Sequence, residues 1–392
     1  MGDFFGIRGL LNLPKGYLRA LKDTFIGICK YFLVPGNLDQ SSSFDIGIFE
    51  LLLQPFMKPI SEIFSLLTVP RRVVITFHQK PDADAMGSGL GLYHFLIQFG
   101  HNVTVISPTN WPSFLNWMPG CKSVVDFEMQ TDKAKQILQQ AEWIFCLDFN
   151  VLNRTKKMEP LIEAHAATKI LIDHHQQPQV EAFDFGISDV MKSSTAEMVY
   201  DFIIQSGHAD KINPAVADCL YAGVMTDTGS FRFNSATANV HRMVADLKDR
   251  GLQHSQVHEN LFDNFLENRF RFFGNILLNR MEIFYEYNTA LITIPQADLI
   301  KYNVKTGDTE GLVNFPLSIK GIKLAAVIID RGDERKSSFR SKAGFDVNAF
   351  ARKYFNGGGH VNAAGGKNSE PLDEVVRRFK VAIRENEQEL NS

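Results

Sequence analysis

The sequence has few cysteines, no long apolar run and no excess of basic charge. Its four cysteines form no C-x-x-C pair and are typical of reduced, buried thiols, so we expect a cytoplasmic protein. They are Cys29, Cys121, Cys146 and Cys219. No stretch is long and apolar enough to span a bilayer. No small-residue cleavage pattern follows a compact apolar region, which disfavours a secretory signal.

The charge balance limits the kind of nucleic acid that the protein binds. A net charge of −3 over 392 residues excludes a broadly basic protein that coats long nucleic acid. A local basic pocket for a short anionic substrate is compatible with this balance. Residues 320–353 contain nine Lys or Arg and four Asp or Glu. This segment either attracts such a substrate or forms an ordinary solvated face.

The length and the pattern of apolar runs predict two α/β domains. A chain of 392 residues is too long for one core. Short apolar runs at 73–76, 103–106, 143–147 and 169–172 alternate with helical patterns, which predicts a parallel sheet covered on both faces. A smaller C-terminal α/β domain follows, and we expect the active site in the cleft between the two domains. The expected boundaries are an extension at 1–56, a catalytic domain at 57–250, a helical connector at 251–285 and a substrate-binding domain at 286–392.

The N-terminal extension carries a basic amphipathic pattern. Residues 15–34 have the spacing of a helix with basic residues on its polar side. A weak contact with a membrane surface or a partner is one interpretation. The other is an additional helix or a poorly ordered extension.

Acidic and histidine residues follow several of the predicted elements. In open parallel sheets, ligands bind beyond the carboxyl ends of the strands. A lone Asp after a strand usually caps a turn or helix, but four segments that deliver carboxylates and imidazoles are hard to explain by capping. Without cations, several of these acids would have to stay protonated. The residues are His78, Asp82, Asp84, Asp148, Asp173, His174, His175 and Asp227.

Such a group is typical of two divalent ions that share one carboxylate and hydrolyse a phosphoester. Mixed imidazole and carboxylate ligands suit Mn²⁺ better than Mg²⁺. The absence of cysteine ligands disfavours a structural zinc site.

Five strings resemble the motifs of one family. TFHQKPDADAMGS, LDFN, DHH and GVMTDTGSF resemble, in order, the four motifs of the DHH phosphoesterases. NGGGHVNAAGG, residues 356–366, is similar to the signature of their C-terminal DHH-associated domain. The resemblance covers residues 57–388, and the compact two-domain layout is most similar to the NrnA-type nanoRNase and pAp (3′-phosphoadenosine-5′-phosphate) phosphatase branch.

The resemblance implies a role for each residue of the N-terminal motifs. It assigns His78, Asp82 and Asp148 to one metal, and it assigns Asp84, Asp148, His174 and Asp227 to the other. Asp173 is implied to support His174, while His175 faces the scissile phosphate and polarises it or assists proton transfer. Ala83 replaces the glycine of many relatives, which puts the local loop geometry in doubt.

The resemblance also implies a substrate clamp in the C-terminal domain. Arg340 matches the strand arginine that grips a terminal phosphate, with Ser338 and Ser341 beside it. Gly358, Gly359 and His360 offer backbone amides and an imidazole to phosphate oxygens. Few aromatic residues adjoin the motifs, so the sequence names no base-stacking residue.

The expected function is hydrolysis of short 5′-phosphorylated RNA to mononucleotides and of pAp to AMP, with two Mn²⁺ ions. Long duplex nucleic acid is not an expected substrate. A phosphodiesterase of linear or cyclic dinucleotide messengers is the first alternative, and a non-catalytic nucleotide-binding protein is the second. The oligomeric state, a homodimer included, is left open.

Overall fold

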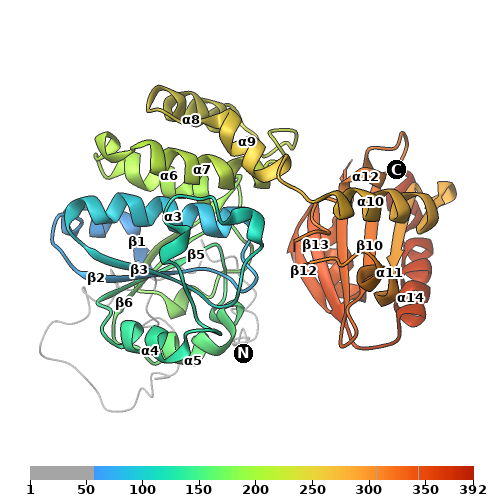
Figure 1. Cartoon of the computed structure of the whole chain (residues 1–392), viewed down its shortest axis with the longest axis horizontal. Coiled ribbons are helices and arrows are strands. Elements are labelled where there is room, and N and C mark those ends of the chain that lie inside the picture. The colour runs from blue at the N-terminus through green and yellow to red at the C-terminus, as the bar shows by residue number, and fades with distance from the viewer. Residues whose placement is uncertain (1–56, 306, 343) are drawn as a thin grey trace, which may run out of the picture. The chain divides into compact units, whose positions relative to one another are not determined.

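A computed structural model describes residues 57–392 with the exception of 306 and 343. The predicted basic helix at 15–34 lies outside the described residues. The described residues contain two β-sheets, each covered by helices (Figure 1). The α/β class and the order of a larger sheet followed by a smaller one confirm the fold expected from the sequence.

The first sheet has seven strands, all parallel, in the order β1-β7-β6-β5-β2-β3-β4. Its four longest strands are the four apolar runs predicted from the sequence. Because both faces are covered, these strands are apolar at consecutive positions. The strands are β1 (Lys58–Pro59), β2 (Arg72–Thr76), β3 (Asn102–Ser107), β4 (Val125–Asp126), β5 (Trp143–Leu147), β6 (Thr168–Asp173) and β7 (Phe185–Ser188).

Alternate residues of these strands belong to two separate cores. Val73 and Ile75 pack with α3 (Ala83–Leu96), α6 (Thr195–Gln205) and α7 (Pro214–Asp227). Val74 packs on the other face with α4 (Thr131–Gln139) and α5 (Glu159–Glu163). Figure 1 shows the two helical layers on opposite sides of the sheet. The sheet is thereby held rigid, and only its strand ends are free to present polar groups.

Two helix predictions differ from the structure at their ends. The sequence pattern predicts a helix over 87–99, but the helix begins at Ala83, because the carboxylate of Asp82 caps it by accepting hydrogen bonds from the amides of Asp84 and Ala85. The pattern also predicts a helix over 158–167, whereas the α-helix covers only Glu159–Glu163 and follows a 3-10 segment at Leu152–Met158.

The scarcity of helix breakers predicts that residues 237–280 are helical, and in the structure they form three helices. They are α8 (Ala238–Asp249), α9 (His254–Phe262) and α10 (Glu267–Asn279). Gly251, at a φ of +100°, lies in the first break, where a residue with a Cβ would be strained. Gly274 lies inside α10 and does not interrupt it.

The second sheet is mixed and follows these helices. Its order is β12-β13-β11-β10-β9-β8, with only β9 and β10 parallel. One face packs on α13 (Val347–Tyr354) and α14 (Leu372–Glu385), and the other on α10, α11 (Gln296–Lys301) and α12 (Asn314–Leu317). The strands are β8 (Met281–Phe284), β9 (Thr289–Ile294), β10 (Leu324–Asp330), β11 (Arg335–Ser341), β12 (Gly357–His360) and β13 (Ala363–Asn368).

The glycine run at 357–359 is an edge strand of this sheet and not a loop. A Cβ at Gly357 would lie 1.9 Å from the carbonyl oxygen of Gly365 on β13, and one at Gly359 would lie 2.5 Å from that of Ala363. Close approach of the two strands therefore requires these glycines.

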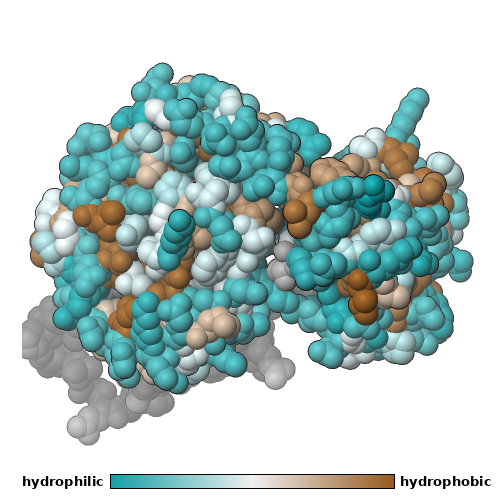
Figure 2. Space-filling view, in the orientation of Figure 1, coloured by the Kyte–Doolittle hydropathy of each residue, from teal (hydrophilic) through white to brown (hydrophobic). Residues whose placement is uncertain are grey.

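The surface in Figure 2 is mainly hydrophilic, with scattered hydrophobic patches. Within the part of the chain that the structure describes, no helix is both long and apolar enough to cross a bilayer.

Candidate active site

The predicted ligands converge at the carboxyl edge of the parallel sheet. His78 follows β2, and Asp148 follows β5 directly with a φ of +60°. Aspartate tolerates this left-handed conformation better than most residues, and such strained positions cluster at functional sites. Asp173 ends β6, and Asp227 ends α7. Ala83 is the first helical residue of α3 with no positive φ, so the departure from glycine carries no strain.

His78, Asp82 and Asp148 form one group of converging side chains. Nε2 of His78 lies 3.3 Å from Oδ2 of Asp148 and 3.9 Å from Oδ1 of Asp82. Nδ1 of His78 is 2.8 Å from the carbonyl oxygen of Gln79 and donates to it in the tautomer that leaves Nε2 unprotonated. The group thus presents one imidazole nitrogen and two carboxylates to a common point.

Asp84, Asp148, His174 and Asp227 form the second group. Nε2 of His174 lies 3.5 Å from both Asp148 and Asp227 and 3.9 Å from Asp84. Nδ1 of His174 is 3.3 Å from the carbonyl oxygen of Lys192. Asp148 contacts the histidines of both groups through different carboxylate oxygens, Oδ2 toward His78 and Oδ1 toward His174.

The start of α6 fixes two of these acids. Asp84 accepts hydrogen bonds from the amides of Thr195 and Ala196, at 2.7 and 2.9 Å. The hydroxyl of Thr195 donates to Asp148 at 3.1 Å. The sequence pattern predicts a helix over 195–205 but assigns Thr195 no part in the site, although the preceding residue Ser194 is a recognisable helix cap.

The crowded acids do not all ionise without a cation. Burial, with the neighbouring Asp148 and Asp227, raises the pKa of Asp84 well above its usual range. Burial and the nearby Asp82 raise the pKa of Asp227 to about 8. Burial also opposes ionisation of Asp148, but the adjacent imidazoles of His174 and His78 outweigh it, and the pKa of Asp148 lies well below the ordinary value.

These residues fit a pair of divalent cations. The buried Nε2 of His174 has no hydrogen-bond partner among the described residues, although three carboxylates surround it. A cation between them would supply the missing partner and remove the repulsion between the acids.

Asp173 holds His175, which corrects the expectation that it supports His174. Its Oδ1 accepts from Nδ1 of His175 at 2.7 Å, whereas His174 contacts the carbonyl of Lys192 through its Nδ1. Asp173 therefore orients the histidine that was expected to face the substrate.

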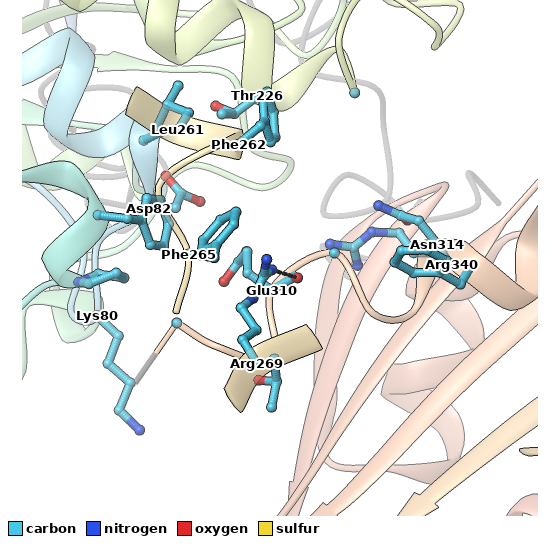
Figure 3. Close-up of a pocket in the computed structure, with 18 of the residues that line it drawn as sticks. Lys80, Asp82, Thr226, Leu261, Phe262, Phe265, Arg269, Glu310, Asn314 and Arg340 are labelled. Atoms are coloured by element: carbon cyan, nitrogen blue, oxygen red, sulfur yellow. Dashed lines mark hydrogen bonds between the residues drawn. The ribbon is translucent and has the colours of Figure 1, made fainter. Parts of the chain in front are cut away.

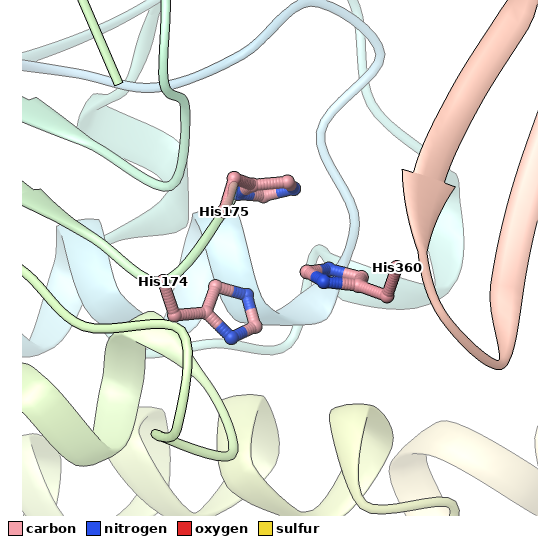
Figure 4. Close-up of side chains that lie close together, drawn as sticks. All are labelled: His174, His175 and His360. Carbon is pink, nitrogen blue, oxygen red and sulfur yellow. The ribbon is translucent and has the colours of Figure 1, made fainter. Parts of the chain in front are cut away.

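His360 of β12 completes a cluster of three imidazoles (Figure 4). Its ring centroid lies 4.7 Å from that of His174 and 4.6 Å from that of His175. Burial, together with repulsion from His175 and His174, lowers the pKa of His360 to about 3. His360 is therefore neutral at physiological pH and offers a neutral hydrogen-bonding group.

Asn348 links β12 to Gln176, which directly follows His175, and no sequence motif indicated this role. Its Oδ1 accepts from the amide of Gly359 at 2.9 Å, and its Nδ2 donates to Gln176 at 3.1 Å. The amide of Gly359, which was expected to face phosphate, is thus already engaged. Gly358 lies beside it in the same strand.

A cleft of about 1380 Å³ adjoins the ligand groups (Figure 3). Asp82 and Asp227 line it together with Arg340 of β11. Burial lowers the pKa of the Arg340 guanidinium, while Glu310, Asp227 and Asp82 oppose this effect. The positive charge of Arg340 therefore lies close to the carboxylates of Asp82 and Asp227.

The two serines near Arg340 differ in position. Ser338 is half-buried on the same face of β11 as Arg340, but it is not among the residues that line the cleft. Ser341 is buried on the opposite face and donates its hydroxyl to the carbonyl of Phe345 at 2.6 Å. Because its position in the strand directs Ser341 to the core, the structure favours an ordinary strand hydroxyl over a phosphate ligand at this position.

The fold and the acid–histidine cluster define the class as a metal-dependent hydrolase. Residues 72–224 match the DHH family, N-terminal domain, and residues 288–386 match the DHHA1 domain. The chain belongs to the DHH family of metal-dependent phosphoesterases.

Similar proteins cover nearly all of the described chain. The bifunctional oligoribonuclease and PAP phosphatase NrnA of Thermus thermophilus is 28% identical, with 84% of this chain and 94% of that protein covered. The protein of the same name from Bacillus subtilis is 25% identical, with 83% and 99% covered. The structure of an exopolyphosphatase-related protein from Bacteroides fragilis is 35% identical and superimposes with a TM-score of 0.81, covering 85% of this chain and 97% of that one.

Proposed function

We propose that the protein is a cytoplasmic, Mn²⁺-dependent phosphoesterase that hydrolyses short 5′-phosphorylated oligoribonucleotides to mononucleotides and pAp to AMP. The observation that carries this proposal is the pair of ligand groups sharing Asp148, which adjoins a cleft lined by Arg340. The names of the Thermus and Bacillus relatives support this choice of substrates. The three cysteines in the described part of the chain are free and buried, which agrees with a reducing compartment.

In this proposal, His78, Asp82 and Asp148 hold one ion. The other is held by Asp84, Asp148, His174 and Asp227. When bound, the metal pair supplies an activated water and neutralises charge on the phosphoryl group. Mixed nitrogen and oxygen ligands favour Mn²⁺ over Mg²⁺.

The side chains of the chain position the substrate and move a proton. Arg340 binds the terminal phosphate, because guanidinium matches phosphate oxygens in geometry and charge. Asp173 holds Nδ1 of His175, which leaves Nε2 of His175 to exchange a proton near the scissile bond. His360, a neutral imidazole of the second domain, donates a hydrogen bond to the substrate.

We also propose a catalytic domain at 57–250, a helical connector at 251–285 and a substrate-binding domain at 286–392.

The test is turnover by the purified protein. With Mn²⁺ it should release mononucleotides from a 5′-phosphorylated RNA dinucleotide and AMP from pAp, and a chelator should abolish both reactions. Asp148→Ala should abolish activity, whereas Asp132→Ala, an exposed acid on α4, should not. Absence of turnover of both substrates with any divalent ion would refute the proposal.

A second candidate is hydrolysis of dinucleotide messengers. The cyclic-di-AMP phosphodiesterase GdpP of Bacillus subtilis is 23% identical over 82% of this chain and 48% of that protein. Parallel rates on pApA, cyclic di-AMP and pAp would distinguish the two. A cyclic substrate lacks the terminal phosphate that Arg340 would bind, so we expect pApA and pAp to be preferred.

A further inference from the structure

The cleft is lined by exposed phenylalanine rings as well as by charges. Phe233 and Phe262 leave 38% and 43% of their surface exposed, and the half-buried Phe265 lines the same cleft. Large aromatic side chains are usually buried more deeply than this. A group of exposed rings beside a catalytic centre indicates a binding surface.

Phe233 is anchored to the turn that carries Asp227. The amides of Arg232 and Phe233 both donate to the carbonyl oxygen of Thr228 at 3.0 Å. The ring lies against Gly229, where a Cβ would come within 2.6 Å of it. Because Gly229 has no Cβ, the ring of Phe233 can pack against its backbone, two residues after Asp227. The two hydrogen bonds to Thr228 fix the backbone that carries this ring.

Phe262 ends α9, and Phe265 lies in the connection to α10 (Figure 3). The guanidinium carbon of Arg269 lies 3.5 Å from the centroid of Phe265, and Phe114 meets the same ring edge to face at 6.1 Å. Arg269 is itself held by the carbonyl oxygens of Asp308 and Glu310. Phe265 is therefore a fixed wall, and Phe262 beside it presents an exposed ring to the cleft.

Basic side chains of the second sheet line the same cleft. Arg331, Lys336 and Arg340 come from the β10–β11 hairpin and its turn. Burial lowers the pKa of Lys336, and the positive charges of Arg331, Lys80 and Arg340 lower it further while Glu310 opposes them. A cluster of cations that repel one another in this way attracts an anion. A cleft lined by both aromatic rings and cations matches a nucleotide, which has an aromatic base and a phosphate.

We propose that Phe233 and Phe262 form a stacking platform for the nucleobases of a short single-stranded oligonucleotide, with Phe265 as its fixed wall. This inference rests on the proposed function and identifies how that site recognises its substrate. Stacking is tolerant of sequence, because every base has a π face. Inorganic polyphosphate has no base and would use only the basic side of the cleft.

The test compares KM for two 5′-phosphorylated dinucleotides, one with both bases and one in which a base is replaced by hydrogen. Phe262→Ala and Phe233→Ala should each raise KM for the complete dinucleotide about 5- to 100-fold, the range expected from losing one stacked base. The wild type should bind the abasic substrate more weakly than the complete dinucleotide. On the substrate that lacks the base stacked by the replaced phenylalanine, the variant and the wild type should have the same KM. Leu266→Ala is the matched control, since Leu266 lies in the same connection, is 76% exposed and does not line the cleft.

Three outcomes would overturn the stacking platform. The first is an unchanged KM in both phenylalanine variants. The second is an equal loss on every abasic substrate, which would indicate a distorted site. The third is an unchanged KM together with a molar mass of the variants in solution that differs from that of the wild type, which would indicate that the rings form a protein–protein interface. If the wild type cleaves no dinucleotide, the proposed function fails first. Calorimetry of the uncleaved dinucleotide then decides this inference, because Phe262→Ala should weaken binding and Leu266→Ala should not.

Discussion

The binding of Mn²⁺ should depend steeply on pH because the site holds protons when it is free of metal. Burial and the charge of Asp82 raise the pKa of Asp227 to about 8, and burial with the charge of Asp148 raises that of Asp84 well above its ordinary value. A cation must displace these protons in order to bind. Metal affinity should therefore increase as the pH rises from 6 to 8.

The magnitude follows from one proton with a pKa near 8. About half of Asp227 is ionised at pH 8 and roughly 1% at pH 6, so the apparent Kd for Mn²⁺ should weaken about 50-fold over this range, or about 2.3 kcal/mol. The raised pKa of Asp84 adds to this effect in the same direction. Isothermal titration calorimetry in buffers of different ionisation enthalpy should report release of at least one proton per site.

The same acids should make the metal-free protein less stable at high pH. Their pKa values are raised in the folded state above the ordinary value of 3.8. Their contribution to stability is therefore fully present below about pH 4 and is lost as the pH rises through about 8. Mn²⁺ should restore it, so the increase in Tm caused by Mn²⁺ should be larger at pH 8.5 than at pH 6.

Two variants provide the controls. Asp227→Asn cannot ionise at this position and should reduce both the pH dependence and the number of protons released. Asp218→Asn removes another acid of α7 whose pKa is raised by burial, but Asp218 lies outside the ligand groups. It should change neither quantity. A Kd that is constant between pH 6 and 8, or equal proton release in Asp227→Asn and the wild type, would refute this reasoning.

Two further predictions test the contact between Asp173 and His175 and the packing of β12 against β13. Asp173→Asn removes the negative charge that holds Nδ1 of His175, and it should lower kcat on the order of 100-fold or more while metal content, measured by elemental analysis, stays unchanged. Gly357→Ala places a Cβ against the backbone of β13 and should destabilise the fold by on the order of 1–3 kcal/mol. Gly358→Ala, whose Cβ would lie 3.4 Å from its nearest neighbour, should keep the wild-type Tm; equal Tm values for the two variants would contradict the steric explanation.

The metal-ligand residues were predictable because they depend on local chain geometry. Each follows a buried strand or lies at the start or the end of a helix, and parallel strands bring their carboxyl ends to one edge. His78, Asp148 and His174 therefore had to lie close together once the apolar runs were recognised as strands. The capping of α3 by Asp82 is likewise a local property, although its start was placed four residues late.

The sequence by itself determined the two-sheet order and the acids and histidines at the sheet edge, because strand periodicity and chain direction are encoded in neighbouring residues. Only the tertiary structure decided which histidine Asp173 holds, which face of β11 Ser341 occupies, and that Gly357 to Gly359 form a strand. It also brought Phe233 together with Phe262, which is 29 positions away in the chain. These contacts depend on how separately predictable elements pack, and packing is set by shapes and distances that sequence spacing does not record.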